Sequence, residues 1–423
     1  MNIMNRISIK FLTLLLAGSA IFRPLVLLAQ QGTTTQNAKI VTTKLADNLY
    51  LLYQNDFVNL VVLTGPDGVL IVDSGFDKNS FSGYVNSPAV LLGELKKLGN
   101  DKIRYIINTH TDFEHAFGNA ELSRGATVIA HYLGRTNLEK NKDFDQAGQP
   151  NLLIGDSIRL YFNGEIINVF HMVGHTDHDL VVEFTRSKVV CTGDLLFPDS
   201  FGYMSSGGNI HQMIKDMDVL HDRYSDDITF VAGHNRLYKR DYFPVYKDML
   251  EKTLAIVSAQ VDKGMGPGEM ISANILKDWT AWNGKILRTL NVNGWIYNLY
   301  RNLSKKLSAA EKTNDLISEM GVDKARPYIR EVLSQKDTYF FFEGDFNRFA
   351  NILLYEKKIP EAIEMYRVVV EQLPTSAKAF YNLARAYAAD GNKDQAISNY
   401  RKSLELNPDN ADAREQLKKL AGK

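Results

Sequence analysis

The chain has 423 residues, of which 45% are hydrophobic and 23% are charged. Its 49 basic residues equal its 49 acidic residues, so the overall charge does not favour nucleic acid or another anionic polymer as a partner. A chain of this length can bury more than one hydrophobic core, and we expect at least two domains. Cys191 is the single cysteine, which excludes an intramolecular disulfide, and we predict that it is a small buried side chain in a strand.

The N-terminus is typical of a secretory signal. Arg6 and Lys10 precede the apolar run FLTLLLAGSAIF, and Arg23-Pro24 interrupts the apolar pattern before it is long enough to span a membrane stably. Such a segment directs export and is then removed. We therefore expect a periplasmic or secreted protein, with an uncleaved membrane anchor as the alternative.

We assign residues 1–29 to the signal peptide. Residues 30–38 read QQGTTTQNA, which is polar and has too little apolar surface to form a core. We predict that these nine residues are a disordered lead-in to the first folded domain.

The segment from His110 to His115, HTDFEH, is the most informative stretch of the chain. It places two imidazoles and two carboxylates directly after the apolar run 103–107, which we predict to be a buried strand. Bringing such groups near a core costs free energy unless they are paired, and a divalent cation pairs with both kinds of group. The pattern therefore predicts metal ligands, in preference to a polar loop with two incidental histidines.

Three later segments have the same form. His175 in MVGHTDHDLVVEF, Asp194 in VVCTGDLLF and His234 in ITFVAGH each stand where an apolar or β-branched run stops. Strand ends that converge at one edge of a sheet can supply ligands from distant positions in the chain. We predict that these side chains join the 110–115 segment in one metal centre. His178 is predicted to lie on a surface loop instead, with contact to a substrate as the alternative.

Together these motifs resemble the metallo-β-lactamase superfamily, whose pattern is H-x-H-x-D-H followed by a histidine, an aspartate and a histidine at strand ends. The resemblance covers roughly residues 40–255 and includes the hairpin VVLTGPDGVLIVDSGFD, with Asp73 in the V-D-[ST]-G position. It implies an α/β fold, the αββα metallo-β-lactamase sandwich, and a catalytic domain that we assign to residues 39–255. Asp73 is a candidate for fixing a ligand histidine by a hydrogen bond, with a satisfied hairpin carboxylate as the alternative.

The chain departs from the family pattern because its motif reads H-x-D-x-E-H. By position, the resemblance implies two ligand sets and a bridging carboxylate: His110, Asp112 and His175 for metal 1; Glu114, His115 and His234 for metal 2; and Asp194 between them. Oxygen ligands are harder than imidazole and suit iron or manganese better than they suit zinc. We expect two divalent ions, with zinc as the default and iron or manganese as alternatives.

The resemblance implies a hydrolase in which a metal-bound hydroxide attacks an ester, amide, lactam or thioester bond of a small-molecule substrate. Asp194 and Glu114 are the candidate catalytic residues. Glu114 could orient the nucleophile or accept its proton, or it could serve only as a metal ligand. Two alternatives are a di-iron redox protein of the flavodiiron type without its flavin domain, and a non-catalytic repeat scaffold.

Beyond Asp241 the apolar residues recur at helical spacing, and residues 256–342 are predicted to be a helical extension or linker. Trp279, Trp282 and Trp295 lie in this stretch, and tryptophan at this density favours packing over ligand contact. We therefore expect these helices to pack against the catalytic domain.

Residues 343–423 contain a repeat with a spacing of 34 residues, from which we predict an all-α helical repeat domain. Four pairs match between the two copies: Phe346 and Phe380, Ala362 and Ala396, Tyr366 and Tyr400, and Pro374 and Pro408. The pattern resembles the tetratricopeptide repeat and implies a concave surface for a peptide or partner protein, with a stabilising or dimerising role as the alternative. Residues 307–334 are expected to form a degenerate first unit or to dock the array.

Overall fold

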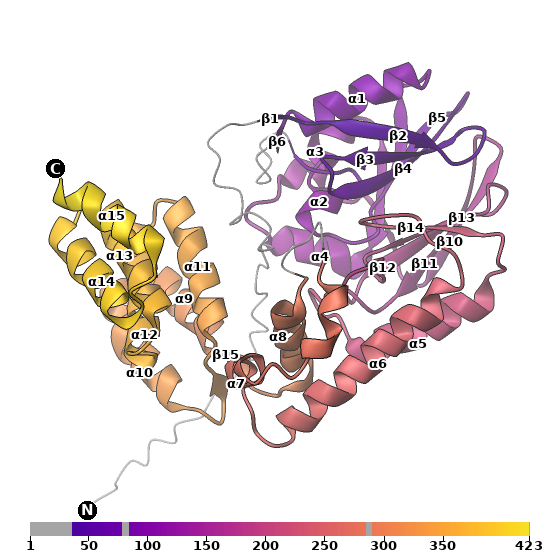
Figure 1. The fold of residues 1–423 in the computed structure, drawn as a ribbon. Helices are drawn as coiled ribbons and strands as arrows, with labels where there is room; N and C mark the ends of the chain where they lie inside the picture. The colour runs from indigo at the N-terminus through magenta and orange to yellow at the C-terminus, as the bar shows by residue number, and fades with distance from the viewer. Residues whose placement is uncertain (1–35, 78–83, 285–289, 423) are drawn as a thin grey trace, which may run out of the picture.

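Two β-sheets packed face to face form one half of the protein, and a stack of helices forms the other (Figure 1). The structure is a computed structural model that describes residues 36–77, 84–284 and 290–422. The predicted signal peptide lies outside the described residues, as do residues 30–35 of the predicted lead-in. The layered α/β architecture followed by helices confirms the fold class predicted from the sequence.

The larger sheet has seven strands in the order β2-β3-β4-β5-β7-β8-β9. Neighbours are antiparallel from β2 to β5 and parallel from β5 to β9. Its strands are β2 (Ile40–Lys44), β3 (Leu49–Gln54), β4 (Val58–Gly65), β5 (Gly68–Val72), β7 (Ile103–Ile107), β8 (Thr127–His131) and β9 (Leu152–Ile154).

The smaller sheet has five strands in the order of the chain, antiparallel except for the last pair. Its strands are β10 (Ser157–Phe162), β11 (Glu165–Met172), β12 (Asp179–Phe184), β13 (Val189–Gly193) and β14 (Thr229–Ala232). Two short parallel pairs lie outside both sheets: β1 (Gln36–Asn37) with β6 (Tyr84–Val85), and β15 (Leu307–Ser308) with β16 (Tyr339–Phe340). The predicted disordered lead-in is therefore wrong at its last residues, because backbone pairing with β6 holds β1 in place.

Central strands of both sheets are apolar on both faces. In β4, Val61 and Leu63 enter the core between the sheets, whereas Leu60 and Val62 enter the core on the outer face. Successive side chains of a strand point to opposite faces, so a continuous apolar run is buried on both sides only when helices cover the outer face. The run VNLVVLTG in β4 therefore requires the smaller sheet on one face of the larger sheet and helices on the other.

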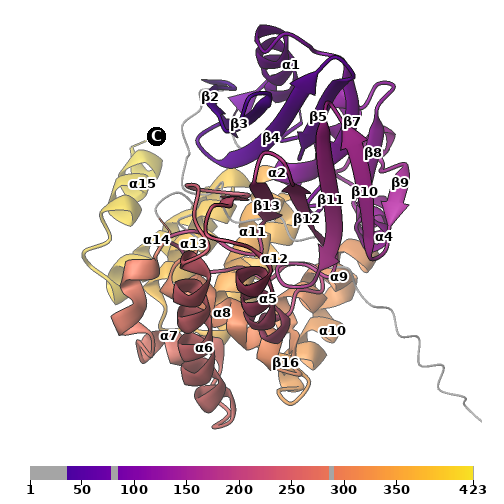
Figure 2. The same cartoon turned by 90° about the vertical axis from the view of Figure 1, so that its right-hand side faces the viewer.

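Helices cover the outer faces of the sandwich. In Figure 2, α5 and α6 lie side by side against the smaller sheet, and α1 covers the larger one. The helices of this half are α1 (Ser87–Lys97), α2 (Phe113–Ala116), α3 (Asn119–Leu122), α4 (Tyr132–Lys140), α5 (Ile210–Arg223) and α6 (Tyr242–Val261), with a short 3₁₀ helix at Gln146–Gly148. The predicted boundary between residues 255 and 256 is wrong, because α6 runs through it without a break.

The rest of the chain is helical. It comprises α7 (Pro267–Ser272), a 3₁₀ helix (Lys277–Trp282), α8 (Val292–Leu303), α9 (Ala309–Met320), α10 (Val322–Ser334), α11 (Glu343–Tyr355), α12 (Ile359–Gln372), α13 (Ala377–Ala389), α14 (Lys393–Leu406) and α15 (Ala411–Ala421). No helix in the described parts of the chain is long and apolar enough to cross a membrane.

The repeat helices do not have a core of their own that begins at residue 343. One hydrophobic core includes side chains from Ala309 in α9 to Ala386 in α13, so α9 and α10 pack together with the first repeat. The repeat positions Ala362 and Tyr366 are fully buried in this core, where the small alanine lets two helices approach closely. Residues 307–334 thus extend the array, as one of the two sequence-based alternatives predicted.

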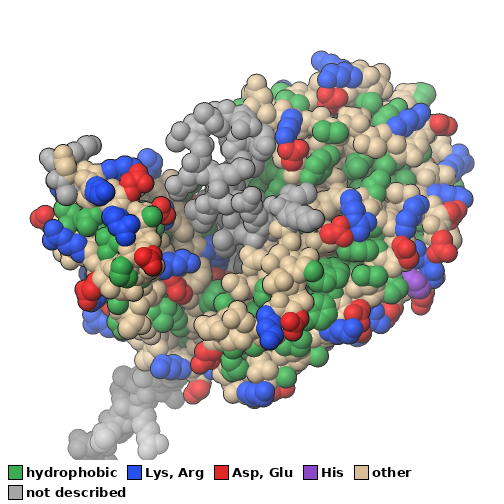
Figure 3. All heavy atoms as spheres, viewed as in Figure 1, with side chains coloured by type: hydrophobic (Ala, Val, Ile, Leu, Met, Phe, Trp, Pro, Cys, Tyr) green, Lys and Arg blue, Asp and Glu red, His purple; other side chains and the backbone are tan. Residues whose placement is uncertain are grey.

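Charged side chains are mixed over the face of the molecule in Figure 3. Lysine and arginine lie among aspartate and glutamate on both halves, with apolar side chains between them. This face therefore presents no broad area of one charge sign.

Trp295 ties α8 to the sandwich. Its ring is buried in the core formed by the smaller sheet with α5 and α6, it stacks on Phe201 with centroids 5.9 Å apart, and its Nε1 donates to Thr253 Oγ1 at 2.8 Å. Trp279 and Trp282 are partly buried against the same core. The expectation that the tryptophans pack is therefore confirmed.

Trp295→Ala is expected to lower the free energy of unfolding by about 3–5 kcal/mol, because it empties a large, fully packed site. Urea denaturation followed by circular dichroism measures the change. Tyr161→Ala is the control, since Tyr161 is 72% exposed and its removal should change the free energy by less than about 0.5 kcal/mol. Equal losses from the two variants would contradict this assignment.

Candidate metal centre

All seven sequence-predicted ligands come together at one end of the two sheets. His110 and Asp112 follow β7, and the next two candidates, Glu114 and His115, lie on the short helix α2. The remaining three follow or connect strands of the smaller sheet: His175 between β11 and β12, Asp194 after β13 and His234 after β14. Parallel pairing of β13 with β14 places their carboxyl ends, and therefore Asp194 and His234, side by side.

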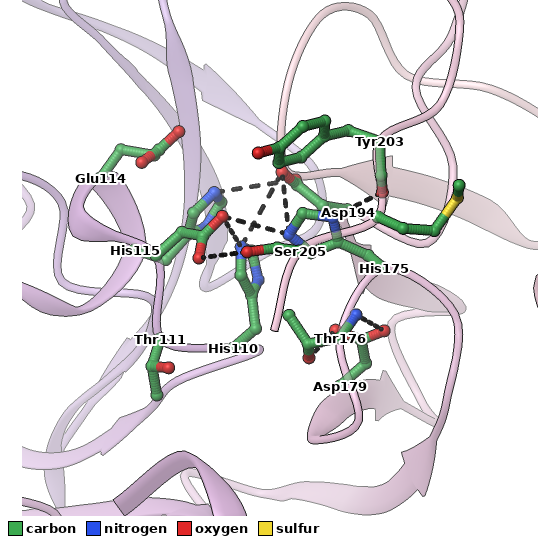
Figure 4. Close-up of polar contacts among 12 residues, drawn as sticks. His110, Thr111, Glu114, His115, His175, Thr176, Asp179, Asp194, Tyr203 and Ser205 are labelled. Carbon is green, nitrogen blue, oxygen red and sulfur yellow. Dashed lines mark hydrogen bonds and ion pairs between the residues drawn. The ribbon is translucent and has the colours of Figure 1, made fainter. Parts of the chain in front are cut away.

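Asp194 stands at the middle of this group. In Figure 4 the imidazoles of His110, His115 and His175 are directed toward its carboxylate. Its oxygens lie within 4.0 Å of one nitrogen on each of four histidines: 3.8 Å from His110, 3.6 Å from His115, 4.0 Å from His175 and 3.3 Å from His234. One carboxylate thus faces ligand candidates from both sheets.

The candidates divide into two groups. Within each, one potential ligand atom per residue lies within 4.8 Å of the others: His110, His175 and Asp194 in the first, and Glu114, His115 and His234 in the second. Asp112 stands beside the first group, with Oδ2 3.3 Å from His175 Nε2 and 4.0 Å from His110 Nε2. This division pairs His110 with His175 and His115 with His234, as the resemblance implied, whereas Asp112 stands outside the first group and Asp194 falls within it.

The atoms that face the centre fit a bound cation. Several buried donor or acceptor atoms here have no hydrogen-bond partner within the protein: Nε2 of His110, His115 and His175, Oε2 of Glu114 and Oδ1 of Asp194. Buried polar atoms are normally paired, and an orphaned atom in a native structure needs an explanation. Lone pairs of imidazole and carboxylate converging on one point are the donor set that divalent metals take. The residues therefore form a site that could hold two ions.

Each of the four histidines is held by its other ring nitrogen. The Nδ1 partners are Thr109 Oγ1 for His110 at 3.0 Å, Asp73 Oδ2 for His115 at 2.8 Å, the Tyr203 carbonyl for His175 at 2.8 Å and the Phe57 carbonyl for His234 at 2.7 Å. A carbonyl or carboxylate at Nδ1 fixes the tautomer that leaves the Nε2 lone pair for a metal. This arrangement is common around metal-ligating histidines and orients all four rings toward Asp194.

Asp73 has both of the roles considered for it. Its carboxylate accepts hydrogen bonds from the backbone N–H of Thr109 at 2.7 Å and from the Thr109 hydroxyl at 2.8 Å, in addition to the bond from His115. The residue adopts a left-handed backbone with φ of 63°, which favours a short polar side chain. Asp73 is therefore a satisfied hairpin carboxylate that also orients a candidate ligand.

Burial and neighbouring charges shift the pKa values in the centre. Burial lowers the pKa of His110 well below its ordinary value and raises the pKa of Glu114 to about 7. Burial would also lower the pKa of His115, but Asp73 and Asp194 raise it to about 9. For His175, burial is outweighed by Asp112, and the pKa rises to about 10.

Asp194 shows the opposite balance. Burial alone would raise the pKa of its carboxyl, but the surrounding histidines, His234 first, hold it well below its usual range. The carboxylates of the centre thus draw protons onto two imidazoles when no other cation is present. Metal ions bind by displacing such protons, so the same arrangement stabilises a divalent cation.

His178 does not lie on the surface, so that expectation is wrong. Its side chain is 2% exposed, with Nδ1 2.7 Å from Asp177 Oδ1 and Nε2 2.8 Å from Thr111 Oγ1. A β-carbon added at Gly134 in α4 would come within 3.0 Å of both the His178 ring and Thr111. The ring is buried because a distant glycine lets α4 approach it, a contact that local sequence does not reveal. Cys191, in contrast, is buried as predicted.

Sequence reasoning missed the loop at residues 203–209, which lies beside His175 and Asp112. The Tyr203 ring lies 5.8 Å from the His175 ring (Figure 4), and Ser205 Oγ donates to Asp112 Oδ1 at 3.4 Å. The segment YMSSGGN has neither a periodic pattern nor a metal-ligand residue. Its proximity to His175 became visible only in the fold.

Comparison with known families gives two matches. Residues 53–234 match the metallo-β-lactamase superfamily. The chain carries a metallo-β-lactamase superfamily domain. Residues 377–410 match the tetratricopeptide repeat. Both parts of the sequence-based resemblance are therefore confirmed, and the superfamily match extends from β3 to His234, so it includes all seven candidate ligands.

Individual relatives cover less of the chain. Hydroxyacylglutathione hydrolase from Pelagibacter ubique (strain HTCC1062) is 33% identical over 110 residues, which are 26% of this chain and 42% of that protein. The chain thus matches less than half of that relative's length.

Among solved structures, a metallo-β-lactamase from Pontibacter korlensis has a TM-score of 0.44 and 15% identity, covering 50% of this chain and 99% of its own. A double mutant of the sec-alkyl sulfatase PisA1 has a TM-score of 0.49 and 14% identity, covering 87% of this chain and 65% of its own.

Asp73→Asn is expected to weaken metal binding by about 10–100-fold, because the amide offers one acceptor where the carboxylate serves three donors. Isothermal titration of the metal-free protein with zinc measures the affinity. Asp67→Asn, on the same hairpin, is the control, because Asp67 bonds the backbone of Asn163 away from the centre. Wild-type affinity in Asp73→Asn would contradict an orienting role for this carboxylate.

Proposed function

We propose that this protein is an exported, metal-dependent hydrolase that binds two divalent cations and cleaves an ester, amide, lactam or thioester bond. The observation that carries the proposal is the convergence of four imidazoles on Asp194, with two further carboxylates beside them, inside a metallo-β-lactamase superfamily domain. The proposed ligand sets are those implied by position: His110, Asp112 and His175; Glu114, His115 and His234; and Asp194 shared between them.

Two bound cations would lower the pKa of a water molecule and polarise the carbonyl group that this water attacks. The protein's own residues hold this chemistry in place. Asp194 reaches both halves of the centre: Oδ1 faces His115 of the second group, and Oδ2 lies between His234 of the second group and His110 and His175 of the first. Glu114 lies against His234, with Oε1 3.7 Å from Nε2, and is proposed as a ligand that also orients the attacking water.

Asp112 marks the side from which a substrate can approach. Its side chain is 16% exposed and is the most accessible of the seven candidate ligands, the others being 6% exposed or less. The Tyr203 ring and Ser205 lie on this same side of the centre. We therefore propose that the scissile bond is presented to the centre beside Asp112, with the buried histidines behind it.

The bond type is tested with a small panel of chromogenic substrates. A thioester is the first to try, because the 33% identical relative is named hydroxyacylglutathione hydrolase. An ester and a β-lactam complete the panel.

Asp194→Asn is expected to lower the rate of hydrolysis by more than about 100-fold and to reduce the bound metal, because the neutral amide loses the charge that both halves share. Spectrophotometric rates and metal content are measured on the same samples. Lys188→Gln, at the other end of β13 and exposed, is the control. Hydrolysis at the wild-type rate in Asp194→Asn would contradict the proposal.

Zinc is the proposed metal. The carboxylates among the candidate ligands make iron the second candidate. Each half of the centre offers two imidazoles and at least one carboxylate, a donor set typical of non-haem iron. A di-iron redox protein is therefore the second candidate function. Iron retained through purification, with no hydrolysis of any substrate in the panel, would favour it over the hydrolase.

Asp112→His is expected to raise zinc affinity and lower iron affinity, because imidazole is a softer ligand than carboxylate. Competition between zinc and ferrous iron, followed by elemental analysis, measures the preference. Asp177→His is the matched control, since Asp177 is a neighbouring carboxylate that contacts His178 and not the centre. An unchanged preference in Asp112→His would mean that Asp112 is not a ligand.

We also propose that the protein is exported and that its repeats bind a peptide or partner protein. The positively charged and apolar N-terminus supports secretion to the periplasm or medium, and the tetratricopeptide match supports binding of a peptide or partner protein by the repeats. Cell fractionation with N-terminal sequencing of the mature protein tests the first part. A protein found in the cytoplasm with residues 1–29 intact would contradict it.

A further inference from the structure

The four histidines of the centre differ in what supports them. The Nδ1 partners of His110, His115 and His234 belong to residues of the larger sheet or its loops, namely Thr109, Asp73 and Phe57. His175 instead bonds the carbonyl of Tyr203, at the start of the loop 203–209. The orientation of His175 therefore depends on how this loop is held.

The loop is fastened to the segment that carries His175 by backbone hydrogen bonds. The N–H of Ser205 donates to the His175 carbonyl at 2.6 Å, the N–H of Asp177 donates to the Ser206 carbonyl at 3.0 Å, and the N–H of Asn209 donates to the Gly174 carbonyl at 2.9 Å. These three bonds join the loop to residues 174–177, so the loop is held directly against the backbone of His175.

The outer side of the loop is held by two amides of α8. Asn298 accepts from the backbone N–H of Met204 at 2.8 Å and donates to the Met204 carbonyl at 3.0 Å. Asn302 accepts from the N–H of Ile210 at 3.1 Å and donates to the Gly208 carbonyl at 2.8 Å. Residues four apart lie on one face of a helix, so α8 presents both amides to the loop together. Asn298 is 5% exposed, and its two bonds are made to the residue that follows Tyr203.

The helix α8 is itself anchored on two sides. Trp295 fixes it in the core of the sandwich, and Tyr297 donates to Asp345 of α11. Arg301 pairs with Glu311 of α9 at 2.9 Å. This helix lies outside residues 53–234, which match the superfamily, so it adds a support that the matched region does not contain.

We propose that α8 is a positioning element for the His175 half of the metal centre, and that Asn298 is its main positioning residue. The inference rests on the proposed function, because it takes His175 as a metal ligand. Asn298 fixes Met204 and thereby the Tyr203 carbonyl, which sets the direction of the His175 Nε2 lone pair. The other half of the centre has no such dependence, since Asp73 and Phe57 hold its histidines.

The two halves provide the test. Metal-free protein is titrated with zinc against a chromogenic chelator, which resolves the affinities of the two ions. Asn298→Ala is expected to weaken one zinc by about 10–100-fold, the range for loss of an outer partner of a ligand, and to leave the other unchanged. In a His175→Ala background, Asn298→Ala should have no further effect on the remaining zinc, because both changes act on the same half.

Asn382→Ala is the matched control. Asn382 is 7% exposed in α13 and bonds Asn347 at 3.1 Å, so its loss removes a buried amide without touching the loop. It should leave both zinc affinities unchanged. Thermal unfolding of the metal-free variants shows whether they remain folded. Asn298→Asp keeps the volume and the acceptor for Met204 N–H and carries the test if Asn298→Ala does not fold.

The outcomes separate this inference from the proposed function. Two zinc ions bound by the wild type, with equal affinities in wild type and in both Asn298 variants, would overturn the positioning role alone. Equal weakening of both ions in a folded Asn298 variant would also overturn it, because a general disturbance does not select one half. A wild-type protein that binds no zinc and no iron would overturn the proposed function, and the inference with it.

Discussion

The candidate centre depends on the electrostatics of one buried carboxylate. Asp194 lies within 4.0 Å of four histidines that come from both sheets, and these neighbours hold its pKa well below the usual range although burial opposes this. A buried negative charge persists only when positive charge compensates it. Without metal, protons on His115 and His175 can supply that charge, because their pKa values are raised to about 9 and about 10. Two divalent cations would supply more positive charge than two protons do. The other candidate ligands, and the hydrogen bonds that orient them, are arranged around this carboxylate.

The fold places the histidines around Asp194 by bringing strand ends together. Hydrogen bonds from neighbouring residues then hold each ring in position. Strands such as β4, buried on both faces, form a rigid sandwich, and the polar side chains stand where those strands stop. Three histidines are braced by the larger sheet and its loops. The fourth, His175, is braced by a loop that two amides of α8 hold in place. The helical half is therefore joined to the centre through α8, the element that also contacts α9 and α11.

Local pattern was enough to predict which side chains converge at the end of the sheets, because each stands in a recognisable motif at the end of an apolar run, and the motifs resemble a known superfamily. The 34-residue spacing likewise predicted the repeat helices.

Contacts between distant segments were not predictable in this way. Asn298 meets Met204 across 94 residues, and His178 is buried because Gly134 lets α4 approach. The boundary expected at residue 255 was wrong because α6 continues to Val261, and breaker residues follow only at GMGPG. The local pattern of polar, turn and helix-forming residues does not reveal which distant segments pack together.

The most direct measurement is the metal content of the full chain purified without added metal, determined by elemental mass spectrometry and repeated after dialysis against zinc. We predict two divalent ions per chain, retained after removal of excess metal, because seven converging ligand candidates leave lone pairs for two cations. A folded protein that holds less than one ion per chain, even after exposure to zinc, would contradict the account, since Asp194 and its four histidines would then be stable with protons alone.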